Sequence, residues 1–558
     1  MQPATRLQRA EALAAAASAR AAGQSERRAA ASIGCPRSTL RARARSDLAA
    51  GDAPAELAAF VATPTGVHWL HRLVLALQFV ITLRAGGGVR LVSEVLELSG
   101  LSAFVGASYG TQQALNAALE QAVVDVAAEQ RQALAAGMRP RAITVCEDET
   151  FHPAICLVAL EPVSNFILLE RYAKDRTAAT WTQALAEACA GLPITVVQGT
   201  SDEATALRRH IEGDHQAHHS PDLFHLQHEV AKATGLPLAR AVREADAEVA
   251  AAEAQLQAQR AAEQAYHRQR HGPGRPPAFA QRLQEARQRC ARASLERDHA
   301  QARQDEAKQL IRALGEAYHP FDLERGEAQP AERLGDRLSM IWQRLAAVAD
   351  AADLPARARA HLAKAQRLTT ALLATVTFFF ASVQQRVDAL NLPPDLEAAV
   401  LQHLIPAIYL QRVAARSAGA ETRARLSALS AQRLAPLRAP EHPIQALEAH
   451  QRDDIERVAS DCADLFQRSS SAVEGRNGQL SLFHHGCHRL STRKLCALTA
   501  VHNFYIQRPN QTTAAERFFG RAPPPLFEQL LERVPLPPRP RQRRARAPKV
   551  PYLTPLAA

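Results

Sequence analysis

Acidic residues stand where two predicted strands end. The apolar run AITVCEDETF reads as a strand that carries Glu147, Asp148 and Glu149, and a second run, PITVVQGTSD, ends at Asp202. Alternation along a strand places Asp148 on the opposite face from its two acidic neighbours. Carboxylates from neighbouring strands repel each other unless a divalent cation lies between them. Because Mg²⁺ binds carboxylate, water and phosphate oxygens, we predict that Asp148 and Asp202 form half of a magnesium site.

The third carboxylate of such a site should come from a nearby helix. The segment SSSAVEGRNGQLS offers Glu474, with serines that can cap a helix start and with Asn477 on the same helical face. Asp222 and Glu229 are alternatives, because they follow the predicted fifth strand directly. We expect His225, close to these acids in the sequence, to pack near the site or to support its ligands.

The strands that carry these acids belong to one predicted sheet within residues 141–235. Three strands are followed by a helix, a fourth strand, a second helix and a fifth strand, DLFHLQHEV. This order predicts an α/β domain with a mixed sheet, in which strands one to three are antiparallel and the last two are joined through helical crossovers. Ligands of such sheets gather at the strand ends.

Helices are predicted for most of the remaining chain. A helical domain spans 51–140, and residues 236–455 read as almost entirely helical. Two long charged segments there flank the interruption HGPGRPPA, which predicts an antiparallel helical hairpin of the kind that can form a coiled coil. The GRP within it is either a simple turn or a minor-groove hook. A mixed pattern returns over 456–532, and the Pro/Arg-rich end, 533–558, is expected to be disordered.

The basic N-terminal region, residues 1–50, has the pattern of a helix-turn-helix. In SERRAAASIGCPRSTLRARAR, an Ala-rich helix ends at a glycine turn, and a proline opens a basic second helix. Arg37, Ser38, Arg41 and Arg45 would then face a DNA major groove and its phosphates. A plain basic helical hairpin is the alternative.

Composition points to a polyanionic partner and away from membranes. The net charge is +11 with a pI near 9.6, which favours nucleic acid, although a GC-rich genome also raises arginine content. The eight cysteines are scattered without a zinc or disulfide pattern, which fits a reducing cytoplasm. The longest uncharged apolar runs, 73–83 and 368–383, are short for a bilayer, so we expect buried helices and no membrane segment.

The strand order with one Asp on the first strand, one Asp after the fourth and a late Glu on a helix resembles the core of bacterial DDE-type transposases. SPDLFHLQHE and SSSAVEGRNGQLS…HNFYIQRPNQTTAAERFFG are similar to segments of insertion-sequence transposases, over about 141–232 and 456–532. The resemblance implies an RNase H-like mixed-sheet core that is interrupted by a large all-helical insertion. The expected regions are 1–50, 51–140, 141–235, 236–455, 456–532 and 533–558.

The resemblance also implies an activity, namely metal-dependent cleavage and strand transfer of DNA at the ends of a mobile element. Asp148 would bridge two Mg²⁺ or Mn²⁺ ions, and Asp202 and Glu474 would each hold one. A homo-oligomer in the bacterial cytoplasm, associated with the nucleoid, is expected, because two element ends must be brought together. A catalytically inactive DNA-binding protein derived from a transposase is the alternative. The residues assigned to DNA contacts near this core are Arg476, Asn477, Arg493 and Lys494.

Overall fold

The computed structural model describes residues 6–41, 54–151, 154–270, 272, 274–487 and 490–538. These residues form a mostly helical protein that contains one mixed sheet, with the strand order β3-β2-β1-β4-β5. The strands are β1 (Arg141–Phe151), β2 (Ile155–Glu161), β3 (Phe166–Tyr172), β4 (Ile194–Ser201) and β5 (His218–Pro221).

The pairing of the strands confirms the predicted mixed sheet. β1 and β2 are antiparallel, as are β2 and β3, whereas β4 and β5 add in parallel beyond β1. The positions of the first four strands are confirmed, but that of the fifth is wrong. Asp222 accepts a hydrogen bond from the amide of Phe224 and caps a helix there, so DLFHLQHEV is helical and β5 lies just before it.

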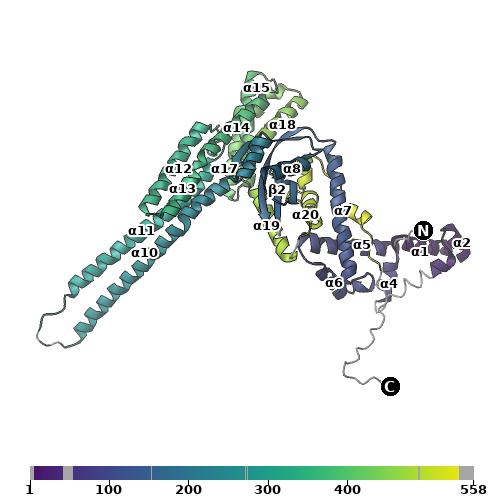
Figure 1. Ribbon diagram of the computed structural model, residues 1–558, viewed down its shortest axis with the longest axis horizontal. Coiled ribbons are helices and arrows are strands. Elements are labelled where there is room, and N and C mark those ends of the chain that lie inside the picture. Colours follow the sequence, from purple (N-terminus) through teal and green to yellow (C-terminus); the bar gives the residue numbers. More distant parts are fainter. Residues whose placement is uncertain are drawn as a thin grey trace.

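Helices cover both faces of the sheet. On one face lie α19 (Ser471–Cys487) and α20 (Thr492–Phe504), and α20 packs in turn on the long α7 (Tyr109–Ala135). The other face is covered by α8 (Ala178–Cys189), α9 (Thr205–Arg208) and the π-helical turn η3 (Arg209–Asp214). The buried Trp181 centres the second layer. Figure 1 shows β2 between α8 and α20.

The N-terminal helices confirm the predicted helix, turn and helix. A helix capped by Ser25 ends at Ser32, Gly34 takes a positive φ of 65° in the turn, and a helix follows whose described part covers residues 37–41. The first of these two helices is α2 (Glu26–Ser32). The other described elements before α7 are α1 (Arg6–Ala21), α4 (Ala55–Ala62), α5 (Pro64–Phe79), η1 (Val80–Arg84), α6 (Val89–Leu98) and η2 (Leu101–Ala103).

A helical segment separates β5 from the chain that returns to the sheet near residue 465. Its first two helices, α10 (Leu223–Arg268) and α11 (Phe279–Ala317), form the predicted hairpin and project far from the rest of the protein (Figure 1). Ala286, Ala293, Ala300 and Ala307 are buried at every seventh position, which is the period of a coiled-coil seam.

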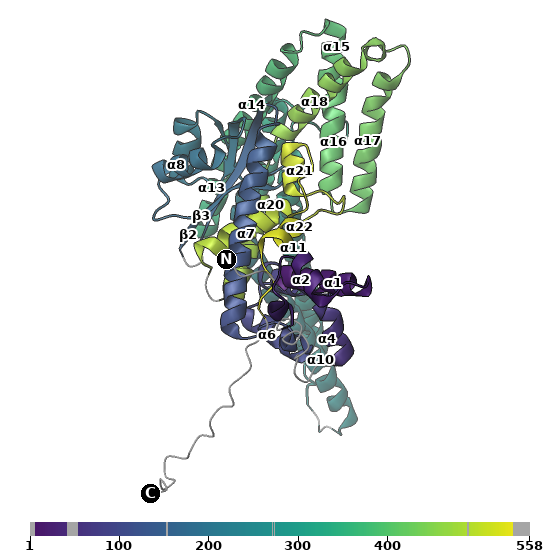
Figure 2. The same ribbon diagram turned by 90° about the vertical axis from the view of Figure 1, so that its right-hand side faces the viewer.

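The remaining helices of this segment bury their own core. Figure 2 shows α15 to α18 at one end of the molecule and α4 and α6 at the other. The two described helices that follow α20 pack with the sheet domain. These elements are α12 (Ala331–Ala351), α13 (Ala356–Arg367), α14 (Thr369–Asp388), α15 (Pro394–Ala399), η4 (Val400–Leu404), α16 (Ile405–Arg416), α17 (Ala420–Arg438), η5 (Pro443–Ala446), α18 (Ala449–Leu465), α21 (Ala514–Phe519) and α22 (Leu526–Arg533).

Two helical stretches are long and apolar enough by composition to cross a membrane, Pro64–Arg84 and Ala356–Asp388. Both place apolar side chains inside protein cores, with Val74 and Val376 fully buried. The core helices of water-soluble proteins pass the same test, so this finding is compatible with the prediction of no membrane segment.

Candidate metal centre

Carboxylates from four separate chain segments converge at one edge of the sheet. Asp148 lies in β1, Asp202 directly follows β4, and Asp222 directly follows β5. Since these three strands are parallel, their carboxyl ends meet at the same edge. Glu474, in the first turn of α19, approaches this edge from the adjoining helix layer.

The three consecutive acids of β1 divide between the two faces of the sheet, as alternation predicts. Glu147 is fully buried on the α8 face, where its Oε1 lies 3.3 Å from Nε2 of the fully buried His210. Glu149, on the same face, accepts a hydrogen bond from Trp181 Nε1. Asp148 turns to the α19 face, where Asn477 Nδ2 donates to its Oδ2 at 2.8 Å. Only Asp148 of the three therefore belongs to the carboxylate cluster.

The environment of Asp148 disfavours its charged form. Burial, and to a smaller extent the negative charges of Glu474 and Asp202, raise the pKa of this carboxyl to about 6, against a hydrogen bond from the backbone amide of Glu149 that lowers it. Glu474 and Asp202 therefore both lie near enough to Asp148 to act on its charge. A divalent cation there would remove the repulsion.

Asp222 organises the cluster through three hydrogen bonds. Its Oδ1 accepts from the amide of Phe224 at 2.8 Å, and its Oδ2 accepts from His225 Nδ1 at 2.9 Å and from the hydroxyl of Ser470. This buried side chain therefore joins the start of α10 to the segment that precedes α19. Glu229, the other alternative, binds His361 and Lys364 elsewhere.

His225 is a basic group that acts on the acids and lowers the pKa of Asp148. Its hydrogen bond to Asp222 raises its pKa, although burial opposes the shift, and the charges of Asp222, Asp202 and Glu474 raise it further. Atoms of Asp222, His225 and Glu474 that can bind a metal lie within 4.8 Å of one another. The tightest group is thus not the predicted triad, although it shares Glu474 with it.

The donor atoms of the cluster suit a hard divalent cation. Asp202 Oδ1 accepts one hydrogen bond, from the amide of Ala204, and within the described residues no hydrogen bond engages the carboxylate of Glu474. Asn477 Oδ1 is buried and lacks a hydrogen-bond partner among those residues. Carboxylate and amide oxygens are ligands of Mg²⁺ and Mn²⁺, and Mn²⁺ also accepts imidazole.

The structure places two of the predicted DNA-binding residues in the interior instead of on a surface. Arg476 is buried and donates from Nε and Nη2 to both carboxylate oxygens of Glu170, at 2.7 and 2.6 Å. Lys494 is buried and donates to the carbonyl of Thr82, with Glu120 at 3.3 Å. The reason is packing, because both cations lie on helix faces that are turned toward the core.

The other predicted DNA contacts have mixed placements. Asn477 engages Asp148, as described above, and Arg493 lies half-exposed at 3.2 Å from Glu120. In the N-terminal region, Ser38 is exposed, Arg41 forms a bidentate pair with Glu26, and Arg37 lies 3.8 Å from the same carboxylate. Exposed pairs of this kind are weak, so both arginines stay available to phosphates. Arg45 lies outside the described residues.

Comparison with known protein families identifies a match to part of the chain. The model of DUF6399, a family of unknown function, matches residues 400–546, which run from the end of the helical segment through α19 to α22. The matched region includes Glu474 but none of the strands. No curated protein matches the chain.

Sequence reasoning left the organising contacts of the site unidentified. The sequence predicts Asp222 as a possible ligand and His225 as a supporting group. It does not predict the hydrogen bond that the hydroxyl of Ser470 donates to Asp222. The available signal was the spacing Asp222-x-x-His225, since an Asp that caps a helix reaches a side chain three residues later.

Proposed function

We propose that this protein is a DDE-type transposase, which cleaves and joins DNA strands at the ends of a mobile element by a metal-dependent reaction. The observation that carries the proposal is the cluster of Asp148, Asp202 and Glu474, whose carboxylates come from two parallel strand ends and a helix and interact electrostatically. An ordinary structural ion pair does not account for it, because the negative charges of Glu474 and Asp202 add to the effect of burial on Asp148, whose pKa is raised to about 6.

The arrangement of the chain supports an RNase H-like core. The strand order β3-β2-β1-β4-β5, with β2 antiparallel to its neighbours, is the order expected of that core. The helical segment between β5 and α19 lies where some of these transposases carry an insertion. In this interpretation, the long hairpin and the helices that follow it are additions to a catalytic sheet domain.

Asp148, Asp202 and Glu474 would hold the ions, and the remaining residues would position them. Bound Mg²⁺ or Mn²⁺ would activate the attacking oxygen and stabilise the leaving oxygen of the phosphodiester. Asn477 holds the Asp148 carboxylate by a 2.8 Å hydrogen bond, and its own Oδ1 is buried without a hydrogen-bond partner among the described residues. Asp222 fixes α10 and Ser470, which sets where α19 begins and therefore where Glu474 lies.

The basic N-terminal helices would bind the element ends. Arg37, Ser38 and Arg41 are exposed on a helix that follows a glycine turn, and the chain carries a net charge of +11. A dimer or larger assembly in the bacterial cytoplasm is part of this proposal, since two DNA ends must meet.

Strand cleavage tests the proposal directly. Labelled duplexes that carry the sequences flanking the gene are incubated with the full-length protein, with and without Mg²⁺ or Mn²⁺. We expect cleavage only with metal, and we expect Asp148→Asn, Asp202→Asn and Glu474→Gln to abolish it while DNA binding persists. Glu203→Gln is the matched control, because Glu203 adjoins Asp202 in sequence but lies 3.7 Å from Arg208.

Two results would count against this function. If the wild type binds the flanking sequences but does not cut them, the alternative of an inactive DNA-binding protein is favoured. If the three substitutions leave cleavage intact, the carboxylate cluster is not its catalytic centre.

A further inference from the structure

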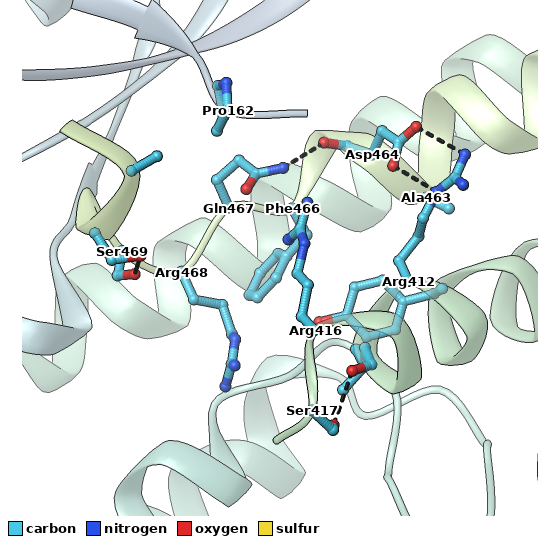
Figure 3. A pocket seen from close by; sticks show the side chains of 14 residues that line it. Pro162, Arg412, Arg416, Ser417, Ala463, Asp464, Phe466, Gln467, Arg468 and Ser469 are labelled. Carbon is cyan, nitrogen blue, oxygen red and sulfur yellow. Dashed lines mark hydrogen bonds and ion pairs between the residues drawn. The ribbon is translucent and has the colours of Figure 1, made fainter. Parts of the chain in front are cut away.

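A cavity of about 420 Å³ lies between the helical segment and the sheet domain (Figure 3). Its walls are α16, the end of α18, residues 466–472 and Pro162 of the turn after β2. Three arginines and one aspartate are its only charged lining residues. It is separate from the carboxylate cluster, although the segment before α19 contributes to both.

Arg468 lines this cavity without a carboxylate partner in the described part of the chain. Its Nη1 donates to the carbonyl of Gly315 at 2.8 Å and to His319 Nε2 at 2.7 Å. Burial lowers the pKa of His319 well below its usual value, and Arg468 lowers it further, so His319 is a neutral acceptor. Neither acceptor balances the guanidinium charge, which burial makes costly.

A second guanidinium, that of the exposed Arg416, lines the same cavity. Arg412 is neutralised by Asp464, with contacts of 2.9 and 3.2 Å, whereas Arg416, one turn further along α16, forms no ion pair among the described residues. Figure 3 shows Arg412 against Asp464 and Arg416 extending toward the segment of Phe466 and Gln467. Burial lowers the pKa values of Arg468 and Arg508, and the positive charge of Arg416 lowers both further, so these cations repel one another.

We propose that this cavity binds a phosphate-bearing anion between Arg416 and Arg468. A planar guanidinium offers paired donors that match phosphate oxygens, and two of them would balance a phosphate dianion. Ser471 adds a hydroxyl to the same walls, whereas those of Ser417 and Ser469 donate to the Val413 carbonyl and to Ser471, and the cavity has the volume of a small-molecule site. The first turn of α19, which begins at Ser471, adds a helix N-terminus that favours anions.

The anion would lie next to the carboxylate cluster along the chain. The carbonyl of Arg468 accepts from the amide of Leu223 at 2.9 Å, and Ser470 binds Asp222. An occupied cavity would therefore brace the segment that precedes Glu474. The phosphate has two possible sources, a backbone phosphate of DNA or a free phosphorylated compound. The proposal does not depend on the proposed catalytic function.

Calorimetric titration of the full-length protein with inorganic pyrophosphate tests the site. EDTA is present throughout, so that metal-bound pyrophosphate at the carboxylate cluster does not contribute. We expect saturable binding that Arg416→Gln weakens by about 10-fold or more and that Arg416→Lys partly restores. Arg260→Gln, on the projecting hairpin, makes the same change in net charge and should leave the affinity unchanged. Arg416 has no described partner to lose, so folding should survive.

A competing duplex identifies the source of the phosphate. If a short DNA duplex displaces pyrophosphate and Arg416→Gln weakens duplex binding by a similar factor, the ligand is a DNA phosphate. If the duplex does not compete, the ligand is a free phosphorylated compound. The proposal is overturned if pyrophosphate does not bind, or if Arg416→Gln and Arg260→Gln have equal effects. Asp148→Asn should bind pyrophosphate normally, which separates this result from a failure of the catalytic proposal.

Discussion

Replacing Asp148 by asparagine should stabilise the metal-free protein while abolishing the proposed activity. The Asp148 carboxylate is held in the folded state beside Glu474 and Asp202 and away from water, so its charge opposes folding. Asparagine has nearly the same shape and no charge, and it retains an oxygen that can accept the hydrogen bond from Asn477.

The size of the effect follows from the pKa. A rise from the ordinary value of 3.8 to about 6 in the folded state corresponds to about 3 kcal/mol of destabilisation at neutral pH. Partial exposure of Asp148 and the loss of one acceptor oxygen reduce the benefit of removing this charge, so we expect Asp148→Asn to raise the free energy of unfolding by about 1–2 kcal/mol. The folded protein binds this proton more tightly than the unfolded chain. The penalty is therefore absent below the unfolded pKa, grows as pH rises from about 4 to 6, and is constant above.

Thermal unfolding in EDTA at about pH 4 and pH 7.5 measures the prediction. For a cooperative unit of about 250 residues, 1–2 kcal/mol corresponds to a rise in Tm of about 2–4 °C at the higher pH, and to little change at the lower. In the presence of Mg²⁺ the wild type should be more stable than Asp148→Asn, because only the wild type keeps all three carboxylate ligands of the proposed site. The control is Asp175→Asn, since hydrogen bonds from Thr180 and Thr177 lower the pKa of Asp175 and its loss cannot stabilise. A variant less stable than the wild type at both pH values would refute the reasoning.

Three further outcomes follow from other contacts. Arg476→Met leaves Glu170 buried without its arginine partner and should destabilise the protein by about 3–5 kcal/mol in urea titrations. The control is Arg72→Met, which breaks an exposed ion pair and should change the free energy of unfolding by about 1 kcal/mol or less. Mn²⁺ affinity, followed by electron paramagnetic resonance, should increase from about pH 5 to 7 and then level off, as the Asp148 carboxyl loses its proton. Ala300→Leu overpacks the hairpin seam and should destabilise it by about 1–3 kcal/mol in thermal melts followed by circular dichroism.

Most of the sheet could be predicted from the sequence, because short apolar runs indicate its strands without information from distant residues. Four strands have continuous apolar runs with clear ends, and alternation correctly separated Asp148 from Glu147 and Glu149. The fifth strand was misplaced because β5 has only four residues, His218–Pro221, without an apolar run. The stronger signal beside it, DLFHLQHEV, has its buried residues Leu223, Leu226 and Val230 at helical spacing.

Partners distant in sequence could not be predicted in this way. Arg476 reads as a surface cation, but its carboxylate partner, Glu170, lies 306 residues earlier on β3. One local clue existed, because the buried residues of α19, Val473, Arg476 and Leu480, form a single stripe that faces the sheet. A charged residue within such a stripe must be paired, and Glu474 next to it is turned out of the stripe toward the strand ends.

The hydrogen bonds favour Glu474 over Asp222 as the third ligand of the proposed metal site. An ionised carboxylate has about four acceptor positions, and Asp222 already uses three of them, for a backbone amide, His225 and Ser470. Binding a metal through Asp222 would compete with contacts that hold α10 and the chain before α19 in place. Glu474 has no such commitment in the described part of the chain. Asp222 therefore acts as the residue that builds the site, and Glu474 is the carboxylate left available to a metal ion.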